Sequence, residues 1–351
     1  MNDDFVTRLG HALRDAADRE EARSARRRAL LTAGARVPRA ASVPAVAVLA
    51  LGAALLIGIY VLASTRSEPA QPPGPRVIAR LAPGGVIDQV RAGFGSAWLF
   101  DTANDRLLRM DPATRRVTGR IALRAGIAVN VGSDAVWVTE GINDLLRIDP
   151  RSNRVVARIP LARGAFSGGV PLPNGNAVWL VGEQRALRVD ARTNRVTKAI
   201  PVAHSGYAVR GGTVLGGDVW VLLSNQQLVR LDGRTGERKA VMRAPLAGDI
   251  ATFAGGLYLA NPDEQVRVDP TSGRVVWRSH IDHLGGAAEA HGLIWAEAPG
   301  RNGDRVIAID PRTGRIVDGV HVGEFGVLWM ERVGPELWMT TAGGHLVILR
   351  P

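Results

Sequence analysis

From residue 76 onward the apolar residues occur in short runs, and within these runs apolar and polar positions alternate. Alternation with a period of two is typical of a half-buried β-strand. The clearest run reads apolar, arginine, apolar, aspartate, and a turn-forming segment follows it. It recurs at residues 108–111, 146–149, 187–190, 229–232 and 266–269, and again at 307–310, where Ala308 replaces the arginine. The chain therefore contains a repeated β-strand.

A second apolar element with an aromatic residue at its centre precedes each of these runs. The aromatic residues are Trp98, Trp137, Trp179, Trp220, Tyr258 and Trp295, and a seventh element carries Trp338. Successive aromatic positions lie 37 to 43 residues apart. That period matches the four-stranded blade of a β-propeller.

One unit can be divided into four strands, which we place at residues 127–131, 135–139, 145–149 and 154–161. The turn after its third strand reads Asp-Pro-Arg-Ser-Asn-Arg, starting at Asp149. Aspartate can accept hydrogen bonds from the turn backbone, proline presets φ, and asparagine tolerates positive φ. We therefore interpret the six repeated aspartates as turn formers and not as catalytic residues.

The seventh unit begins near Phe325 and has room for only three strands before residue 351. Residues 76–81 read Arg-Val-Ile-Ala-Arg-Leu and match the outer strand that begins at Arg154. Pairing this first strand with the last unit would close the ring and protect its open edge. The sequence thus predicts an all-β fold over 76–351: a seven-bladed β-propeller of four-stranded antiparallel blades, closed by strand 76–81.

The segment before the repeat predicts a membrane anchor. Residues 45–63 carry no charge over nineteen positions, enough for a helix to cross about 30 Å of hydrocarbon. Arginines precede this run at positions 26, 27, 28, 36 and 39, and only Arg66 follows closely. The positive-inside rule therefore places the N-terminus in the cytoplasm and the repeat outside. A signal peptide cleaved near Ala63 is the alternative, but more than forty residues precede the apolar run.

These observations predict four regions: a partly helical cytoplasmic segment at 1–42, a transmembrane helix at 43–63, a proline-rich linker at 64–75 and the propeller at 76–351. The expected location is the plasma membrane, crossed once, with the propeller on the extracytoplasmic side. The cytoplasmic segment can be a docking helix for a partner, or it can serve only to set the topology.

The chain carries a formal net charge of +11 and no cysteine. Nearly all of the positive charge is arginine, scattered through the repeat without interleaved stacking aromatics, so the pattern does not favour a nucleic-acid partner. Without cysteine there is no disulfide, thiol nucleophile or cysteine metal ligand.

The repeat resembles the seven-bladed superfamily that includes the YncE-like proteins and the virginiamycin B lyase group. The resemblance is carried by Val136–Glu140 followed by Arg147–Pro150, and it extends over about 275 residues. Residues 266–277 also resemble pyrroloquinoline-quinone-type repeats. The resemblance implies the fold, while its signature residues serve packing and turns and assign no function. Virginiamycin B lyase relatives use histidine, glutamate and magnesium for an elimination, but no local motif here transfers those residues.

Propellers usually bind ligands on the face that carries the loops between blades and the turns between second and third strands. The candidate ligand-binding residues on that face are His204, Tyr207, Asp249, His283, His321, Glu324, Glu140 and Glu297. Imidazole and carboxylate together can bind a divalent cation or act as acid and base. No other cofactor is predicted, and the metal ligands stay unassigned. The alternative is that polar residues simply populate exposed loops.

The sequence favours a binding module, which can also act as a sensor, over an enzyme. Its partner could be a protein, a peptide, a glycan or a small molecule. Two alternatives stay open: a metal-assisted lyase or hydrolase with its site over the propeller channel, and a structural component of envelope assembly. The sequence contains no Gly-x-Ser-x-Gly elbow, phosphate loop or His-Glu-x-x-His motif.

Overall fold

The computed structural model describes residues 74–351, except 142, 162–168, 205, 262, 281–285, 299 and 301–302. Residues Pro72–Pro351 form one compact unit. The predicted cytoplasmic segment, the predicted transmembrane helix and most of the linker lie outside the described residues. Within the described ranges, no helix is long and apolar enough to span a bilayer.

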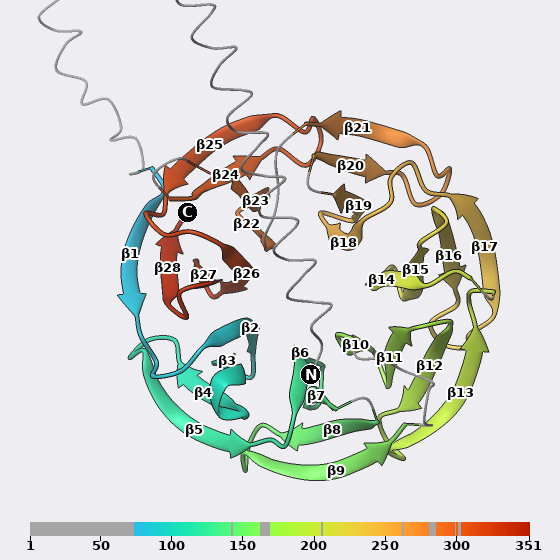
Figure 1. Cartoon of the computed structure of the whole chain (residues 1–351), viewed down its shortest axis with the longest axis horizontal. Helices are drawn as coiled ribbons and strands as arrows, with labels where there is room; N and C mark the ends of the chain where they lie inside the picture. The colour runs from blue at the N-terminus through green and yellow to red at the C-terminus, as the bar shows by residue number, and fades with distance from the viewer. Residues whose placement is uncertain are drawn as a thin grey trace, which may run out of the picture. The chain divides into compact units, whose positions relative to one another are not determined.

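The described part of this unit is built of seven four-stranded antiparallel sheets, arranged as blades around a central axis (Figure 1). Blade 1 comprises β2 (Ile87–Gly93), β3 (Ser96–Asp101), β4 (Arg106–Asp111) and β5 (Arg116–Ala122), with a short 3₁₀ turn η1 (Thr102–Asn104) between β3 and β4. Blade 2 comprises β6 (Gly126–Val131), β7 (Val136–Glu140), β8 (Asp144–Asp149) and β9 (Arg154–Pro160). Blade 3 comprises β10 (Leu172–Asn174), β11 (Ala177–Gly182), β12 (Arg185–Asp190) and β13 (Arg195–Pro201).

The other four blades repeat this order. Blade 4 comprises β14 (Val209–Leu215), β15 (Asp218–Leu223), β16 (Gln227–Leu231) and β17 (Arg238–Arg243). Blade 5 comprises β18 (Asp249–Phe253), β19 (Gly256–Asn261), β20 (Glu264–Val268) and β21 (Val275–Ser279). Blade 6 comprises β22 (Ala287–Ala290), β23 (Leu293–Ala298), β24 (Arg305–Ile309) and β25 (Ile316–His321). Blade 7 comprises β26 (Val327–Val333), β27 (Glu336–Thr341), β28 (Leu346–Arg350) and β1 (Arg76–Leu81).

The predicted closure of the ring is confirmed. Strand β1 is the outer strand of blade 7 and pairs antiparallel with β28, with Arg76 opposite Arg350 and Leu81 opposite Leu346 (Figure 1). A β-bulge lies between Val77 and Ala79. The first and last strands of the described chain therefore belong to the same sheet, and blade 7 has four strands like the other described blades.

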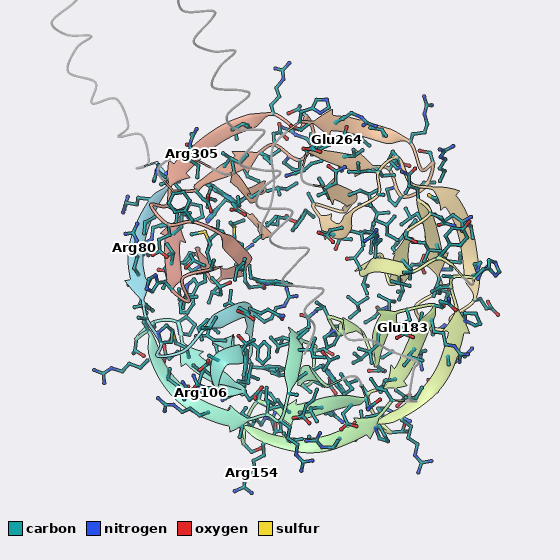
Figure 2. All side chains as sticks on the ribbon, in the orientation of Figure 1. Arg80, Arg106, Arg154, Glu183, Glu264 and Arg305 are labelled. Atoms are coloured by element: carbon teal, nitrogen blue, oxygen red, sulfur yellow. The ribbon has the colours of Figure 1, made fainter. Side chains whose placement is uncertain are left out.

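The core consists of layers between neighbouring blades. The second strand of most blades is buried along its whole length, as in β3, β7, β11, β15 and β27. The repeated tryptophans Trp98, Trp137, Trp179, Trp220 and Trp338 lie in these strands and are fully buried. A strand buried on both faces reads as a continuous apolar run, which explains the pattern that marks each unit. Side chains fill the space between adjacent sheets (Figure 2).

The repeated aspartates form turns, as predicted. In the blade 2 turn, Asp149 accepts hydrogen bonds from the backbone N–H of Arg151 (3.1 Å) and Ser152 (3.2 Å). The Ser152 hydroxyl is the largest cause of the lowered pKa of Asp149, and backbone N–H groups are the largest cause for the other five aspartates. Asn153 then adopts φ 55°, the left-handed conformation that asparagine tolerates.

Meander topology gives the ring two distinct faces. The interblade face carries the loops between blades, described at 82–86, 123–125, 161, 169–171, 202–204, 206–208, 244–248, 280, 286 and 322–326, together with the turns between second and third strands. The Asp-turn face carries the first-to-second-strand hairpins and the six aspartate turns.

The inner strands present open backbone edges, and side chains of neighbouring inner strands cover parts of them. The Gln89 amide on β2 donates to the carbonyl of Ile127 (3.2 Å) and accepts from the N–H of Val129 (3.1 Å) on β6. The Glu289 carboxylate on β22 accepts from the N–H of Ala254 (2.6 Å), next to β18. The Gln89 contacts satisfy backbone groups of β6 that would otherwise template pairing with another strand, and the Glu289 contact satisfies a turn N–H.

Candidate functional site

The structure places the described candidate residues on the interblade face or at strand ends that border it. His204 and Tyr207 are exposed on the loop between β13 and β14, where the Tyr207 N–H donates to the His204 carbonyl (3.2 Å). Asp249 begins β18, and His321 ends β25; both are exposed. His283 lies outside the described residues. In the part of the chain that is described, no group of three or more His, Asp or Glu side chains could hold a metal ion.

Glu140, at the end of β7, is engaged in a buried structural contact. Its carboxylate pairs with Arg158 on the outer strand β9 and accepts from the backbone N–H of Arg124 (2.7 Å) in the loop between blades 1 and 2. Burial opposes ionisation of Glu140, but these hydrogen bonds outweigh it and lower the pKa of the carboxyl group. Arg158 also pairs with Asp144 (3.0 Å). Its guanidinium therefore joins β9 to the end of β7 and to the start of β8.

Glu324 joins three segments of the closing blade. Its carboxylate accepts from the Thr341 hydroxyl at the end of β27 (2.9 Å) and contacts Nδ1 of His345 (3.0 Å). It also lies 3.6 Å from Nε of Arg80 on β1, while Nη2 of Arg80 donates to the Val322 carbonyl. Arg80 is labelled in Figure 2, on the outer strand of this blade. Glu324 therefore helps to hold the closing strand β1 against the loop between blades 6 and 7.

Glu297 on β23 and Asp304 form a buried carboxyl pair; the two residues are 2% and 3% exposed. Burial, with the adjacent Asp304 carboxyl as a second cause, raises the pKa of Glu297 to about 8. Asp304 in turn accepts from the N–H of Gly326 (2.6 Å) and Val327 (3.4 Å), at the start of β26. The raised pKa favours the protonated form of Glu297 at neutral pH, and the contacts of Asp304 with Gly326 and Val327 tie blade 6 to blade 7.

The inner strands of blades 1 and 7 carry a further charged cluster. Arg91 on β2 lies over the ring of Trp329, 4.2 Å from its centroid, and pairs with Glu331 (3.3 Å) on β26. Its Nε donates to the Val129 carbonyl on β6 (3.1 Å). Burial raises the pKa of Glu331 and lowers that of Arg91, and their pairing opposes both shifts. The cluster spans three blades, so it serves the junction where the ring closes.

The sequence did not identify the residues that contact Glu324, Glu297 and Glu331. These residues are Arg80, His345, Asp304 and Arg91. Positions 80 and 324, or 91 and 331, lie more than 200 residues apart. A single chain carries no local signal for such pairs, because they exist only once the last blade meets the first.

Several large apolar side chains remain exposed on the interblade face. They are Val86, Tyr207 and Phe325 in interblade loops, and Ile127 and Leu328 at the second positions of the inner strands β6 and β26; their exposed fractions run from 37% to 60%. We call this set the apolar mouth, because the inner strands begin there around the axis. Exposed aromatic and aliphatic groups on one face are typical of interaction surfaces.

No protein-family model matches the chain, and no curated protein matches it. Among solved structures it is similar to the crystal structure of BamB from Moraxella catarrhalis, with a TM-score of 0.54 and 17% sequence identity. The match covers 76% of this chain and 86% of that one. At this identity the likeness concerns the fold, and it agrees with the blade architecture described above. The described part of the chain is thus a seven-bladed β-propeller with a fold similar to that of BamB.

Proposed function

We propose that this propeller is a recognition module that binds a protein partner through the apolar mouth of the interblade face. The observation that carries the proposal is the exposure of Tyr207 (45%) and Phe325 (60%) on two different interblade loops. Rigid aromatic side chains contribute large contact areas at low entropy cost, and they are enriched at protein interfaces. The exposed histidines His204 and His321 supply polar groups near the same loops.

The proposal includes a position in the membrane: residues 43–63 anchor the chain, and the propeller faces the extracytoplasmic side. The support is the uncharged run 45–63 with arginines on its N-terminal side. A cytoplasmic segment joined to an external binding module could also make the protein a sensor.

The two lysines of the chain give a direct test of this orientation. Lys198 and Lys239 both lie in the propeller, on β13 and β17, and both are exposed. A membrane-impermeant amine reagent should therefore label the protein on intact cells. The double variant Lys198→Arg/Lys239→Arg should lose this labelling. Labelling that appears only after cell lysis would contradict the proposed orientation.

The binding face can be tested by cross-linking in native membranes. A photo-crosslinker at position 208, beside Tyr207 and exposed, should give a defined protein adduct. The double variant Tyr207→Ala/Phe325→Ala should reduce that adduct about tenfold or more, because truncated hot-spot residues cost about 1 to 2 kcal/mol each. Val156→Ser is the matched control, since Val156 is 55% exposed but lies on the outer strand β9.

The outcome also separates recognition from envelope assembly. A single adduct in fixed stoichiometry would indicate a permanent assembly component, whereas an adduct that depends on growth conditions would indicate a recognition module. Equal loss of the adduct in Val156→Ser and in the double variant would count against the apolar mouth as the binding surface.

A further inference from the structure

The third-strand arginine of blade 3, Arg188, departs from the pattern of the other blades. In blades 1, 2, 4 and 5 the corresponding arginine lies over the ring of the blade's central aromatic residue. The guanidinium carbons of Arg109, Arg147, Arg230 and Arg267 are 5.3, 5.6, 5.2 and 6.0 Å from the centroids of Trp98, Trp137, Trp220 and Tyr258. In the described structure Arg188 has no such contact with Trp179.

In blades 1 and 4 the residue two positions before the tryptophan supplies an acceptor to Nε of this arginine. In blade 1 Nε of Arg109 donates to the Ser96 hydroxyl (2.8 Å), and in blade 4 Nε of Arg230 donates to Asp218 (2.6 Å). In blade 3 this position is Ala177, which offers no acceptor. Nε of Arg188 is buried and has no hydrogen-bond partner among the residues that the structure describes.

The backbone carbonyl that usually accepts from this arginine also has another donor in blade 3. Nη1 of Arg147 donates to the carbonyl of Ala191 (2.8 Å), in the aspartate turn of the next blade. For Arg188 the matching carbonyl is that of Gly233, which instead accepts from the indole N–H of Trp179 (3.1 Å). Arg188 donates only through Nη1, to the Thr197 hydroxyl (3.0 Å), in the described structure. Its Nε–Nη2 edge, the edge that binds two oxygens side by side, is left without a partner.

A cavity of about 550 Å³ lies beside Arg188 on the Asp-turn face, between blades 3 and 4. Its wall includes Ala177, Asn174, Asp190 and two further arginines, Arg192 and Arg234. The wall of the cavity thus contains three arginines and one carboxylate, that of Asp190. Asp190 already accepts from the N–H of Arg192 and Thr193 in its own turn, and these bonds lower its pKa.

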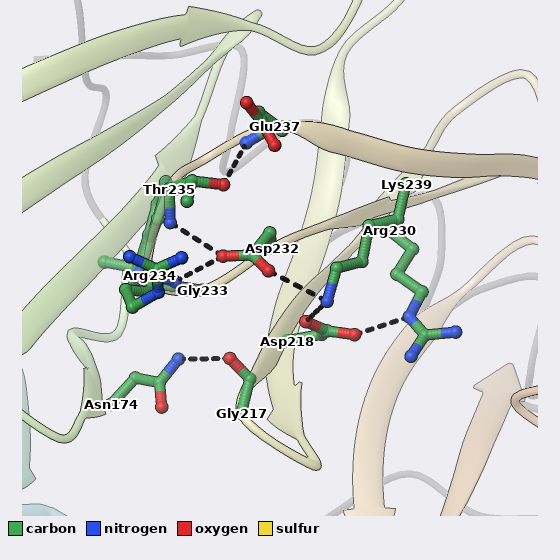
Figure 3. Close-up of polar contacts among 11 residues, drawn as sticks. Asn174, Gly217, Asp218, Arg230, Asp232, Gly233, Arg234, Thr235, Glu237 and Lys239 are labelled. Atoms are coloured by element: carbon green, nitrogen blue, oxygen red, sulfur yellow. Dashed lines mark hydrogen bonds and ion pairs between the residues drawn. The ribbon is translucent and has the colours of Figure 1, made fainter.

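The wall of the cavity is tightly packed where blades 3 and 4 meet, and two acidic groups nearby already have cationic partners. The Asn174 amide donates to the Gly217 carbonyl (2.8 Å) and links the two blades, while a side chain at Gly233 would collide with that carbonyl. Two acidic groups of blade 4 are occupied elsewhere: Lys239 bridges Asp218 (2.7 Å) and Asp232 (2.9 Å), and Arg230 also binds Asp218 (Figure 3).

We propose that this cavity is an anion site that binds a carboxylate through the guanidinium of Arg188, with Arg192 and Arg234 adding charge at its mouth. The carboxylate can belong to a small free polycarboxylate or to an acidic side chain of a peptide. A carboxylate oxygen would give this guanidinium an acceptor, as Ser96 does for Arg109 in blade 1 and Asp218 does for Arg230 in blade 4. The site lies on the face opposite the apolar mouth and does not depend on the function proposed above.

The test is calorimetric titration of the full-length protein at low salt with two probes, citrate and a hexaglutamate peptide. We expect saturable binding of at least one probe. Arg188→Gln should weaken it about tenfold or more, because a hydrogen bond to a charged group contributes about 1.5 to 3 kcal/mol. Arg151→Gln is the matched control: Arg151 occupies in the blade 2 turn the place that Arg192 has in blade 3, and the charge change is identical.

A second variant avoids removing the arginine. Ala177→Asp restores in blade 3 the acceptor that blade 4 has at Asp218, so it should occupy Nε of Arg188 from within and abolish binding. Its melting temperature should not fall. Citrate binding alone would assign a free small anion, and peptide binding alone would assign an acidic segment of a protein. No binding of either probe, or equal affinity in wild type, Arg188→Gln and Ala177→Asp, would overturn the proposal.

Discussion

Several charged pairs in this propeller lie where strands or blades meet. Glu140 with Arg158 joins two strands of blade 2, whereas Glu324 with Arg80 and Arg91 with Glu331 join segments that are distant in sequence. Removing Arg158 would leave the buried Glu140 carboxylate without its cationic partner, which costs more than the pair itself contributes. Their role at the residue scale is therefore to specify which segments meet.

The Glu297–Asp304 pair makes the stability of the protein depend on pH. The pKa of Glu297 is about 8 in the folded state and 4.5 without the surroundings of the fold. Between these values the folded protein holds a proton that the unfolded chain has released, so the free energy of unfolding falls as pH rises from about 4.5 to 8. Glu297→Gln keeps a donor towards Asp304 without a charge, and it should flatten this decline.

Denaturant unfolding at pH 5, 6, 7 and 8 measures the effect. Glu183→Gln is the control, because Glu183 is an exposed carboxylate on the same face, and its slope with pH should equal that of wild type. A Glu297→Gln slope equal to that of wild type would show that Glu297 is ionised in the folded protein.

At the scale of single elements, the inner strands are the least protected. Each has one paired edge and one edge towards the axis, and side chains take the place of a missing strand at several points. The Gln89 amide does this most completely, because one side chain satisfies both a carbonyl and an N–H of β6.

Replacing Gln89 with alanine should expose this edge. We expect Gln89→Ala to lower the free energy of unfolding by about 1 to 3 kcal/mol, since it removes two hydrogen bonds of about 0.5 to 1.5 kcal/mol each. The specific readout is hydrogen exchange, in which the Val129 N–H should lose protection. Gln184→Ala, at an exposed turn, should change neither quantity. Unchanged exchange at Val129 in Gln89→Ala would mean that another group covers this edge.

At the scale of the whole propeller, stability depends on one strand pair that is distant in sequence. Blades 1 to 6 are continuous chain segments, but blade 7 requires β1 to pair with β28 across most of the molecule. Loop closure of this length carries a large entropy cost, so we expect blade 7 to be the first to open.

A disulfide across this pair tests the closure directly. Arg76 and Arg350 face each other at the end of the strand pair, and the chain has no cysteine that could interfere. The double variant Arg76→Cys/Arg350→Cys should oxidise to an intramolecular disulfide and gain about 2 to 4 kcal/mol relative to its reduced form. The two single variants should show no such redox-dependent change in melting temperature. A double variant that forms only intermolecular disulfides would contradict the register of β1 with β28.

The repeat could be predicted from the sequence because the features that define each strand and turn lie close together in the chain. Each second strand needs a buried aromatic residue, each third strand alternates, and each turn needs an aspartate acceptor and a residue that tolerates positive φ. Even the closure could be predicted, because residues 76–81 match an outer strand and the last unit lacks one. The candidate binding residues could be placed on a face by the same reasoning, and their function remains a prediction.

What the residues do within that face was decided only by the tertiary structure. Glu140, Glu297 and Glu324 looked like ligands in exposed loops, yet their partners Arg158, Asp304 and Arg80 draw all three into contacts between strands and blades. The unpaired edge of Arg188 was equally hidden, because it depends on what Ala177 fails to offer once β11 and β12 lie side by side. Turns and periodicity arise between neighbours in the chain, whereas burial and pairing of charges arise between blades.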